Sequence, residues 1–164
     1  MRYHAPFRME ATQASKGGLR VAVTGAAGDL GQLLLPLLEQ DADVESILVL
    51  DVAKPRGAKV EFHRVDLTRY DAESELSEAL AEHPVDVFYH LAFLYGPVRD
   101  GSLAHELEVI GTMNVLSAVA RARVPRLIVP SLTALYGARG GHPALLAEET
   151  PLTGCPGKIG RAHV

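Results

Sequence analysis

The amino-acid sequence predicts an α/β fold in which a mainly parallel sheet is covered by helices on both faces. Short apolar runs of strand character alternate along the chain with longer amphipathic stretches of helical character. Such alternation is typical of parallel sheets, because each strand returns to the sheet through a crossover helix. The length of 164 residues, 48% of them hydrophobic, is enough for one domain with a sizeable core.

The spacing of apolar residues sets the order of the elements. Strands are expected over 19–23, 46–50, 59–65, 85–90 and 126–129, and helices over 29–39, 71–83 and 103–120. Pro36 lies inside the first helix and is expected to kink it or to remove a hydrogen bond. Asp71 is expected to be the N-cap of the second helix, and Arg121 and Arg123 suit the C-terminal end of the third.

Charge and composition exclude several classes of protein. The formal net charge of −4 argues against a dedicated nucleic-acid binder, which needs concentrated Lys and Arg. No apolar run approaches the roughly twenty residues of a membrane helix, so no membrane partner is expected. The single cysteine, Cys155, cannot form an internal disulfide and fits a reducing compartment. A cytoplasmic protein is therefore predicted.

Three glycines follow the first predicted strand at the spacing of a dinucleotide-binding turn. Gly25 permits a sharp turn, Gly28 lets a pyrophosphate approach the backbone, and Gly31 allows close packing of helix on strand. The N-terminus of the following helix then offers unpaired N–H groups to the phosphates. A glycine-rich turn without a ligand is the alternative, but the strand–turn–helix context favours phosphate binding.

An acidic residue, Asp51, ends the second predicted strand, 20 residues after Gly31. A carboxylate at this place can accept hydrogen bonds from the ribose hydroxyls, and its charge repels a 2′-phosphate. NAD is therefore expected as the cofactor, in preference to NADP. Lys54 and Arg56 argue the other way, because a basic side chain could accommodate that phosphate. The alternative interpretation of Asp51 is a plain turn residue.

Six short motifs follow one another along the chain. They are Thr24–Gly31 (TGAAGDLG, similar to TGxxGxxG), Asp66-Leu67, His90-Leu91-Ala92 (similar to HLAA), Gly111–Leu116 (GTMNVL, similar to GTxNVL), Ser131–Gly137 (similar to SSxAVYG) and Glu148–Leu152 (similar to ExxPLxP). On these motifs, residues 19–158 resemble the N-terminal part of an extended short-chain dehydrogenase/reductase of the NAD-dependent epimerase/dehydratase family.

The resemblance implies a Rossmann-type doubly wound parallel sheet, truncated after about five strands. It implies cofactor contacts at Gly25, Ala27, Gly28, Asp29, Leu30, Gly31, Asp51, Asp66, Leu67, Leu91 and Ala92. It also implies an oxidoreductase acting on a nucleotide sugar or a related hydroxyl or carbonyl substrate. The full-length parent is expected to be a homodimer.

The catalytic residues of that family are matched only in part. In the family, a Tyr whose pKa is lowered by a Lys four residues later acts as general base, and a Ser or Thr holds the same substrate oxygen. No Tyr follows Tyr136, so the Tyr-x-x-x-Lys pair is absent. Leu132 stands at the position of the family's catalytic Ser or Thr. Thr133 is the candidate for the role of this Ser or Thr, and Ser131 is the alternative. Strand alternation, however, would point the side chains of Ser131 and Thr133 away from the face of Leu132. Glu108 stands at the position of the family's Asn.

Two functions follow from this partial match. The parent is expected to be an enzyme, with the present chain an inactive cofactor-binding fragment. The alternative is a non-catalytic dinucleotide-binding sensor or scaffold, favoured by Leu132 and Glu108. A Tyr-x-x-x-Lys pair shortly after Lys158 in the gene would decide for the enzyme.

The two ends of the chain are expected to lie outside the 19–158 cofactor-binding domain. Residues 1–18 show no periodicity and are predicted to be a disordered extension. Residues 159–164 (IGRAHV) have no counterpart in the family and match the translated start of a common sequencing adapter. We expect adapter read-through that interrupts the gene before its catalytic Tyr, with an unusual natural C-terminus as the alternative.

No metal site is predicted. The seven histidines form no pair at metal-ligand spacing along the sequence. His90 is interpreted as a packing residue at a strand end, and His105, Glu106 and Glu108 as one solvated helix face.

Overall fold

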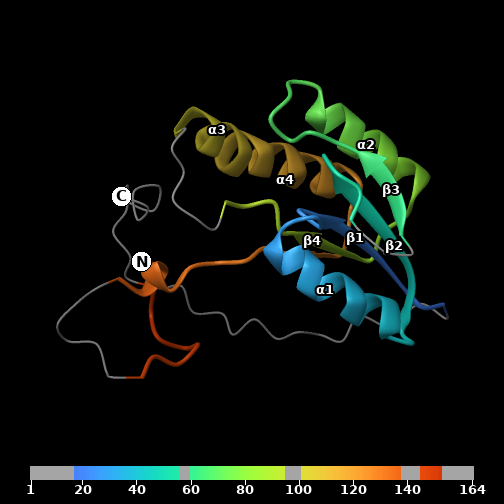
Figure 1. Cartoon of the computed structure of the whole chain (residues 1–164). Helices are drawn as coiled ribbons and strands as arrows, with labels where there is room; N and C mark the ends of the chain where they lie inside the picture. Colours follow the sequence, from blue (N-terminus) through green and yellow to red (C-terminus); the bar gives the residue numbers. More distant parts are fainter. Residues whose placement is uncertain (1–16, 56–59, 95–100, 138–144, 153–164) are drawn as a thin grey trace.

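The computed structural model describes residues 17–55, 60–94, 101–137 and 145–152. The predicted extension up to residue 16, Arg56, Cys155 and the segment predicted to derive from an adapter lie outside the described residues. Figure 1 shows the order of the described elements along the chain.

The centre of the molecule is a five-stranded parallel sheet in the order β3-β2-β1-β4-β5. Its strands are β1 (Leu19–Thr24), β2 (Val44–Asp51), β3 (Glu61–Arg64), β4 (Val87–His90) and β5 (Arg126–Ile128). The chain builds outward from β1 to β3 and then returns to the other side of β1, so the strand order reverses between β1 and β4. This order is that of a doubly wound sheet, and it confirms the Rossmann-type prediction.

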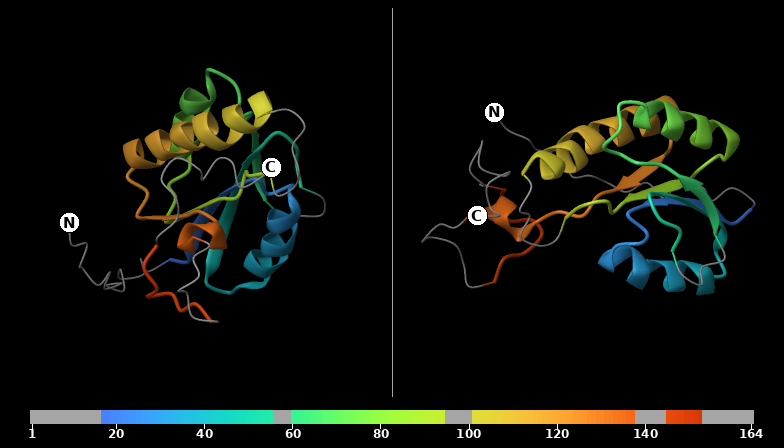
Figure 2. Two further views of the ribbon diagram at one scale, coloured as in Figure 1. Left: turned by 90° about the vertical axis from the view of Figure 1, so that its left-hand side faces the viewer. Right: turned by 45° about the horizontal axis from the view of Figure 1, so that its top comes forward.

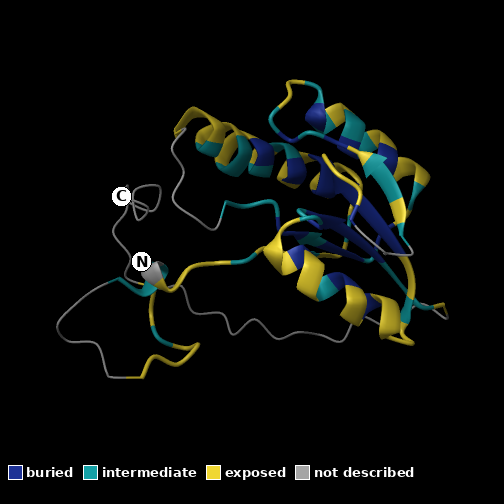
Figure 3. Cartoon of the chain, in the orientation of Figure 1, coloured by how far each residue is buried: buried dark blue, intermediate teal, exposed yellow. Residues whose placement is uncertain are grey.

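Helices cover both faces of the sheet (Figures 1 and 2). Helix α1 (Asp29–Gln40) lies on one face, and α2 (Ala72–Glu82) packs against α4 (Thr112–Arg121) on the other. The alternation of β2 divides the core: Leu48 and Leu50 face α2 and α4, whereas Ile47 and Val49 face α1. Figure 3 shows the buried residues gathered in the strands and on the helix faces turned toward them. Along the described ranges, no helix has the length and apolar character needed to cross a membrane.

Pro36 is exposed and lies inside α1, as predicted, and does not end the helix. The other helices differ from the sequence prediction at two places. Asp71 stands at the N-cap of α2 but makes no capping bond, because its two carboxylate oxygens accept from Arg69 at 2.9 and 2.8 Å. The single helix predicted over 103–120 starts earlier, as α3 (Gly101–His105), and continues through a π-helical segment, η1 (Glu106–Gly111), into α4.

Candidate functional site

The site is built around the turn that follows β1, at the point where the strand order reverses. Gly25 has a φ of +71°, a conformation that side chains rarely adopt. A Cβ on Gly25 would lie 2.4 Å from the carbonyl carbon of Leu91 and 2.4 Å from the nitrogen of Ala92. The turn therefore packs directly on the segment that follows β4, which only a glycine at this position allows.

The other two glycines of the turn have different roles. A Cβ on Gly31 would lie 2.4 Å from the Cα of Ala26 and 2.4 Å from the carbonyl oxygen of Gly25, so Gly31 allows α1 to approach the turn. A Cβ on Gly28 would meet only the carbonyl oxygen of Gly25, at 3.3 Å, and the backbone of Gly28 is extended. The fold therefore does not require glycine at position 28, but a ligand that approaches the backbone there would.

Helix α1 starts at this turn with the N–H groups of its first turn open to a ligand. The first helical bond runs from the N–H of Gln32 to the carbonyl of Gly28 at 2.9 Å. The N–H groups of the first turn have no partner inside a helix, so they carry the positive end of the helix dipole. Asp29 and Leu30 occupy this first turn and are exposed. Such an N-terminus fits a pyrophosphate.

Asp51 fixes the glycine turn to the end of β2. Its side chain is only 9% exposed, Oδ2 accepts the N–H of Ala27 at 3.1 Å, and Oδ1 accepts the N–H of Val52 at 2.7 Å. A carboxylate has about four acceptor positions, so these two bonds leave capacity for ribose hydroxyls. Asp51 therefore orients the turn in addition to offering the acceptor that the sequence predicted.

A cavity of about 240 Å³ lies at the carboxyl ends of the central strands. Eight of the predicted cofactor residues line it: Gly25, Ala27, Gly28, Asp51, Asp66, Leu67, Leu91 and Ala92. Asp29, Leu30 and Gly31 form the first turn of α1, in which Asp29 and Leu30 are exposed and Gly31 is buried. Oδ1 of Asp66 accepts from the N–H and the hydroxyl of Thr68, at 3.1 and 2.7 Å, which fixes this carboxylate at the cavity. The structure thus brings the predicted residues together in one site.

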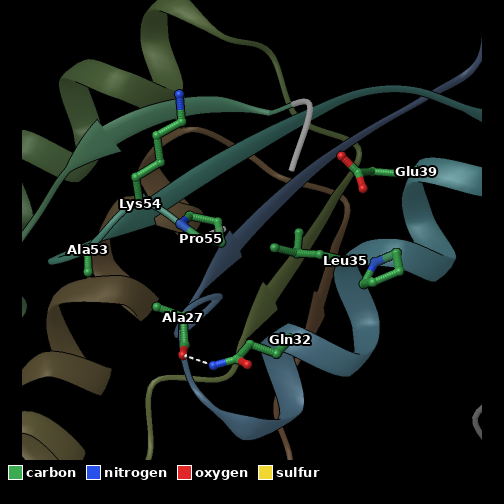
Figure 4. A pocket seen from close by; sticks show the side chains of 8 residues that line it. Ala27, Gln32, Leu35, Glu39, Ala53, Lys54 and Pro55 are labelled. Carbon is green, nitrogen blue, oxygen red and sulfur yellow. Dashed lines mark hydrogen bonds between the residues drawn. The ribbon is translucent and has the colours of Figure 1, made fainter. Parts of the chain in front are cut away.

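A second cavity, of about 420 Å³, lies between α1 and the segment after β2 (Figure 4). Its lining joins Ala27 and Gln32 to Lys54, and the side-chain amide of Gln32 donates to the carbonyl of Ala27 at 2.7 Å. In Figure 4 the ammonium end of Lys54 extends away from Ala27 and Gln32. Of the two basic residues that could favour NADP, Lys54 is therefore near the turn but turned away from it.

A buried hydrogen-bond chain that was not predicted from the sequence lies beneath the site. The ring Nδ1 of His90 lies 2.7 Å from the hydroxyl of Thr24, and its Nε2 lies 3.0 Å from the hydroxyl of Thr112. His90 and Thr24 are fully buried, and burial lowers the pKa of His90 to about 4. The neutral imidazole thus joins β1, β4 and α4 behind the glycine turn. Polar residues that end two buried strands, Thr24 and His90, were the signal in the sequence.

Glu108 is not part of a solvated helix face, and that prediction is wrong. The side chain is half-buried and Oε1 accepts the N–H of Leu94 at 3.1 Å. The π-helical segment η1 places this carboxylate toward the segment after β4. Gly111, the last residue of the segment, packs closely on Leu67, since a Cβ there would lie 3.0 Å from the Leu67 Cβ. π-Helical turns inside α-helices are frequent at functional sites.

The structure does not bring Thr133 to the cavity. β5 ends at Ile128, and Thr133 opens a 3-10 turn, η2 (Thr133–Tyr136), with its side chain exposed. The expectation from strand alternation is therefore wrong, because Ser131, Leu132 and Thr133 lie beyond the strand. Leu132 is 43% exposed, and its carbonyl accepts the N–H of Leu135 at 3.1 Å.

The chain is similar to known proteins in sequence and in fold. The sequence profile of the NAD dependent epimerase/dehydratase family matches residues 21–157. The chain belongs to this family. The match covers the glycine turn, Asp51, η1 and the segment after β5.

Individual relatives are similar to the chain over part of their length. L-arabinose 1-dehydrogenase (NAD(P)(+)) of Haloferax volcanii is 32% identical over 114 residues, which are 68% of this chain and 40% of that protein. UDP-glucose 4-epimerase 2 of rice, Oryza sativa subsp. japonica, is 30% identical over 154 residues, which are 84% of this chain and 36% of that protein. The chain thus spans about two fifths of the length of these relatives.

A solved structure supports the fold. The UDP-glucose 4-epimerase of Thermus thermophilus, in complex with NAD, superposes with a TM-score of 0.63 and 29% identity. The similarity covers 82% of this chain and 44% of that chain. This agreement supports the doubly wound arrangement of the sheet.

Proposed function

We propose that the chain is the cofactor-binding part of an NAD-dependent oxidoreductase of the epimerase/dehydratase type. The observation that carries the proposal is the cavity at the reversal of strand order, where the glycine turn, the N-terminus of α1 and Asp51 meet. Ligands of doubly wound sheets bind at this place, outside the carboxyl ends of the strands.

Each part of the site suits one part of a dinucleotide. The N–H groups of the first turn of α1 would hold the pyrophosphate, and Gly28 leaves the space for its approach. Asp51 would accept the ribose hydroxyls, and the backbone of Asp66 and Leu67 would border the adenine. Leu91 and Ala92 would line the nicotinamide half of the cavity. When bound, NAD supplies a hydride acceptor, and its reduced form a hydride donor.

The substrate proposed for the full-length protein is a nucleotide sugar or a related hydroxyl or carbonyl compound. The support comes from the similarity to UDP-glucose 4-epimerases and to an L-arabinose dehydrogenase. The parent protein is further proposed to be a homodimer, as the family resemblance implies. The single cysteine supports a reducing compartment, so the cytoplasm remains the proposed location.

The preference for NAD is tested by calorimetric titration of the chain with NAD and with NADP. We expect tighter binding of NAD, because the buried carboxylate of Asp51 repels a 2′-phosphate. Asp51→Asn should weaken NAD binding about tenfold, or about 1.4 kcal/mol, and should reduce the preference over NADP. Tighter binding of NADP by the unmodified chain would overturn the role given to Asp51.

A matched control separates this local effect from a change in net charge. Asp43→Asn removes one negative charge from an exposed position between α1 and β2, at the opposite end of β2 from Asp51. It should leave both affinities unchanged. Equal losses in the two variants would mean that long-range electrostatics, and not the contact at Asp51, govern cofactor binding.

The second candidate function is a dinucleotide-binding sensor or scaffold without catalysis. Two observations favour it: Leu132 is exposed where the family has Ser or Thr, and Glu108 is engaged with the N–H of Leu94. The full-length gene decides between the candidates. A Tyr-x-x-x-Lys pair after Lys158, together with NAD reduction in the presence of a nucleotide sugar or free sugar, supports the enzyme. Stable NAD binding without that pair and without turnover supports the sensor.

A further inference from the structure

Three potential metal ligands meet at the edge of the sheet, away from the cofactor cavity. Nε2 of His63 lies 3.7 Å from Oε1 of Glu61, and Nδ1 of His83 lies 3.2 Å from Oε2 of the same carboxylate. The two imidazole rings are 5.0 Å apart and inclined at 69°. If each residue offers one ligand atom, the three ligand atoms lie within 4.8 Å of one another.

The fold explains why these residues meet. Glu61 and His63 are two positions apart on β3, so they share one face of the strand. They pair in register with Leu48 and Leu50 of β2, which face α2. His83 directly follows the last residue of α2, as its C-cap. The crossover from β3 through α2 thus returns His83 to the strand that precedes the helix.

The donor set has the chemistry of a transition-metal site. Two neutral imidazoles and one carboxylate form a set that Zn²⁺ uses with a fourth position open to water. Tetrahedral bonds of about 2.0–2.1 Å place neighbouring ligand atoms about 3.3 Å apart. The observed separations of 3.7 Å (His63 Nε2 to Oε1) and 3.2 Å (His83 Nδ1 to Oε2) involve the two different oxygens of Glu61. One ligand atom from each residue lies within 4.8 Å of the others, so the side chains have to move closer to bind a single ion. The side chains are 53%, 33% and 27% exposed at Glu61, His63 and His83, so they have room to close around an ion.

A further carboxylate lies behind one of the histidines. Nε2 of His83, the nitrogen that does not face Glu61, lies 4.0 Å from Oε2 of Glu82. At 4.0 Å this is a charge contact and not a hydrogen bond, and it has to shorten before His83 can donate its second N–H to the carboxylate, as metal-bound histidines commonly do. The placement therefore suits Nδ1 of His83 as the ligand atom.

We propose that Glu61, His63 and His83 form a binding site for a divalent transition-metal cation of the Zn²⁺ type. The ion would connect the edge strand β3 to the C-terminal end of α2. Since β3 is one of the two edge strands of the described sheet, such a connection would support a strand that has a neighbour on one side only. The site is independent of NAD, and of whether the full-length protein is an enzyme.

The test is a titration of the chain with ZnCl₂, followed by NMR of ¹⁵N-labelled histidine rings. The resonances of Nε2 of His63 and Nδ1 of His83 should shift together and saturate at one equivalent of Zn²⁺. The temperature of unfolding should rise with Zn²⁺ and return to its starting value when EDTA is added. Each of the variants Glu61→Gln, His63→Gln and His83→Gln should weaken binding at least about tenfold.

A control variant and a residue-resolved readout make the result decisive. His105 is exposed at the end of α3 and is not part of the cluster, so His105→Gln should leave affinity unchanged. Far-UV circular dichroism and metal-free unfolding identify any variant that fails to fold. If Zn²⁺ shifts other histidines while His63 and His83 stay unchanged, or if Glu61→Gln binds Zn²⁺ like the unmodified chain, the three residues form only an ion pair and the proposal is wrong.

Discussion

Replacement of the glycines in the turn after β1 should separate the folding of the chain from cofactor binding. Gly28→Ala and Gly31→Ala add the same methyl group at positions three residues apart. At Gly31 the new Cβ would meet backbone atoms of Gly25 and Ala26 at 2.4 Å, whereas at Gly28 it would meet one carbonyl oxygen at 3.3 Å. We expect Gly31→Ala to unfold the chain more easily, and Gly28→Ala to impair only the binding of NAD.

The magnitudes follow from these distances. Carbon atoms prefer separations of about 3.5–4.0 Å, so Gly31→Ala forces a backbone shift of more than about 1 Å. Overpacking of this kind costs about 3 kcal/mol, and the better helix propensity of Ala returns at most about 1 kcal/mol. The net loss of about 2 kcal/mol lowers the melting temperature by roughly 4–8 °C.

For Gly28→Ala the opposing effects nearly cancel. The position has extended backbone angles that Ala adopts freely, with φ −77° and ψ 175°. Ala is a poorer N-cap than Gly, but it also reduces the entropy of the unfolded chain, so stability should change by less than about 0.5 kcal/mol. The methyl group would occupy the approach of the pyrophosphate, and NAD binding should weaken about tenfold or more, which is about 1.4 kcal/mol.

Urea unfolding and calorimetric titration with NAD measure the two effects on the same samples. Opposite patterns are expected in the two variants, so neither can be explained by general damage to the turn. Equal destabilisation by Gly28→Ala and Gly31→Ala would refute this reasoning. So would wild-type NAD affinity in a folded Gly28→Ala variant.

Three further predictions concern polar groups around the site. Burial lowers the pKa of His90 from 6.5 to about 4, so as the pH falls the unfolded chain is protonated at His90 before the folded chain is. About 3 kcal/mol of folding stability, fully present above pH 6.5, should therefore be lost as the pH falls to about 4. Urea unfolding of His90→Asn across this pH range should show no such loss of stability. Glu108→Leu leaves the N–H of Leu94 without its acceptor and should cost about 1–3 kcal/mol with faster amide exchange at Leu94, whereas Glu108→Gln should retain most of the stability. Asp29→Asn removes a carboxylate from the first turn of α1, where its negative charge would repel a pyrophosphate, so NAD binding measured by calorimetry should tighten about two- to fivefold. Unchanged affinity would mean that Asp29 lies too far from the phosphates to affect their binding.

Features that depend on local sequence were predicted well. The five strands, the turn after β1 and the position of Asp51 at the end of β2 follow from apolar runs and glycine spacing that are read within short windows. The strand order then follows from the connection rules for parallel sheets. The cofactor cavity was therefore predictable, since its lining consists of residues at strand ends.

Features that depend on contacts between distant segments could not be predicted in the same way. The bridge from Thr24 through His90 to Thr112 joins three elements. The polar ends of the two buried strands are a signal for it, but no spacing along the sequence identifies Thr112 as the third partner. The same holds for His63 and His83, which lie 20 positions apart and meet only because α2 returns to β3. The catalytic role of Thr133 stays a prediction. The expectation from alternation, which pointed Ser131 and Thr133 away from the face of Leu132, assumed a strand there, whereas β5 ends at Ile128.

The turn is held in place by the protein itself before any ligand binds. Asp51 fixes the N–H of Ala27, the N–H of Leu91 donates to the carbonyl of Thr24 at 2.9 Å, and His90 bridges Thr24 from below. Because the turn is already ordered, binding of a dinucleotide loses little conformational entropy in it. The affinity therefore depends on the contacts between the protein and the dinucleotide and not on the closing of a loop. Thr133 stands in the opposite situation, exposed on a 3-10 turn outside the cavity. The preformed turn therefore makes cofactor binding the property of this chain that can be tested most directly.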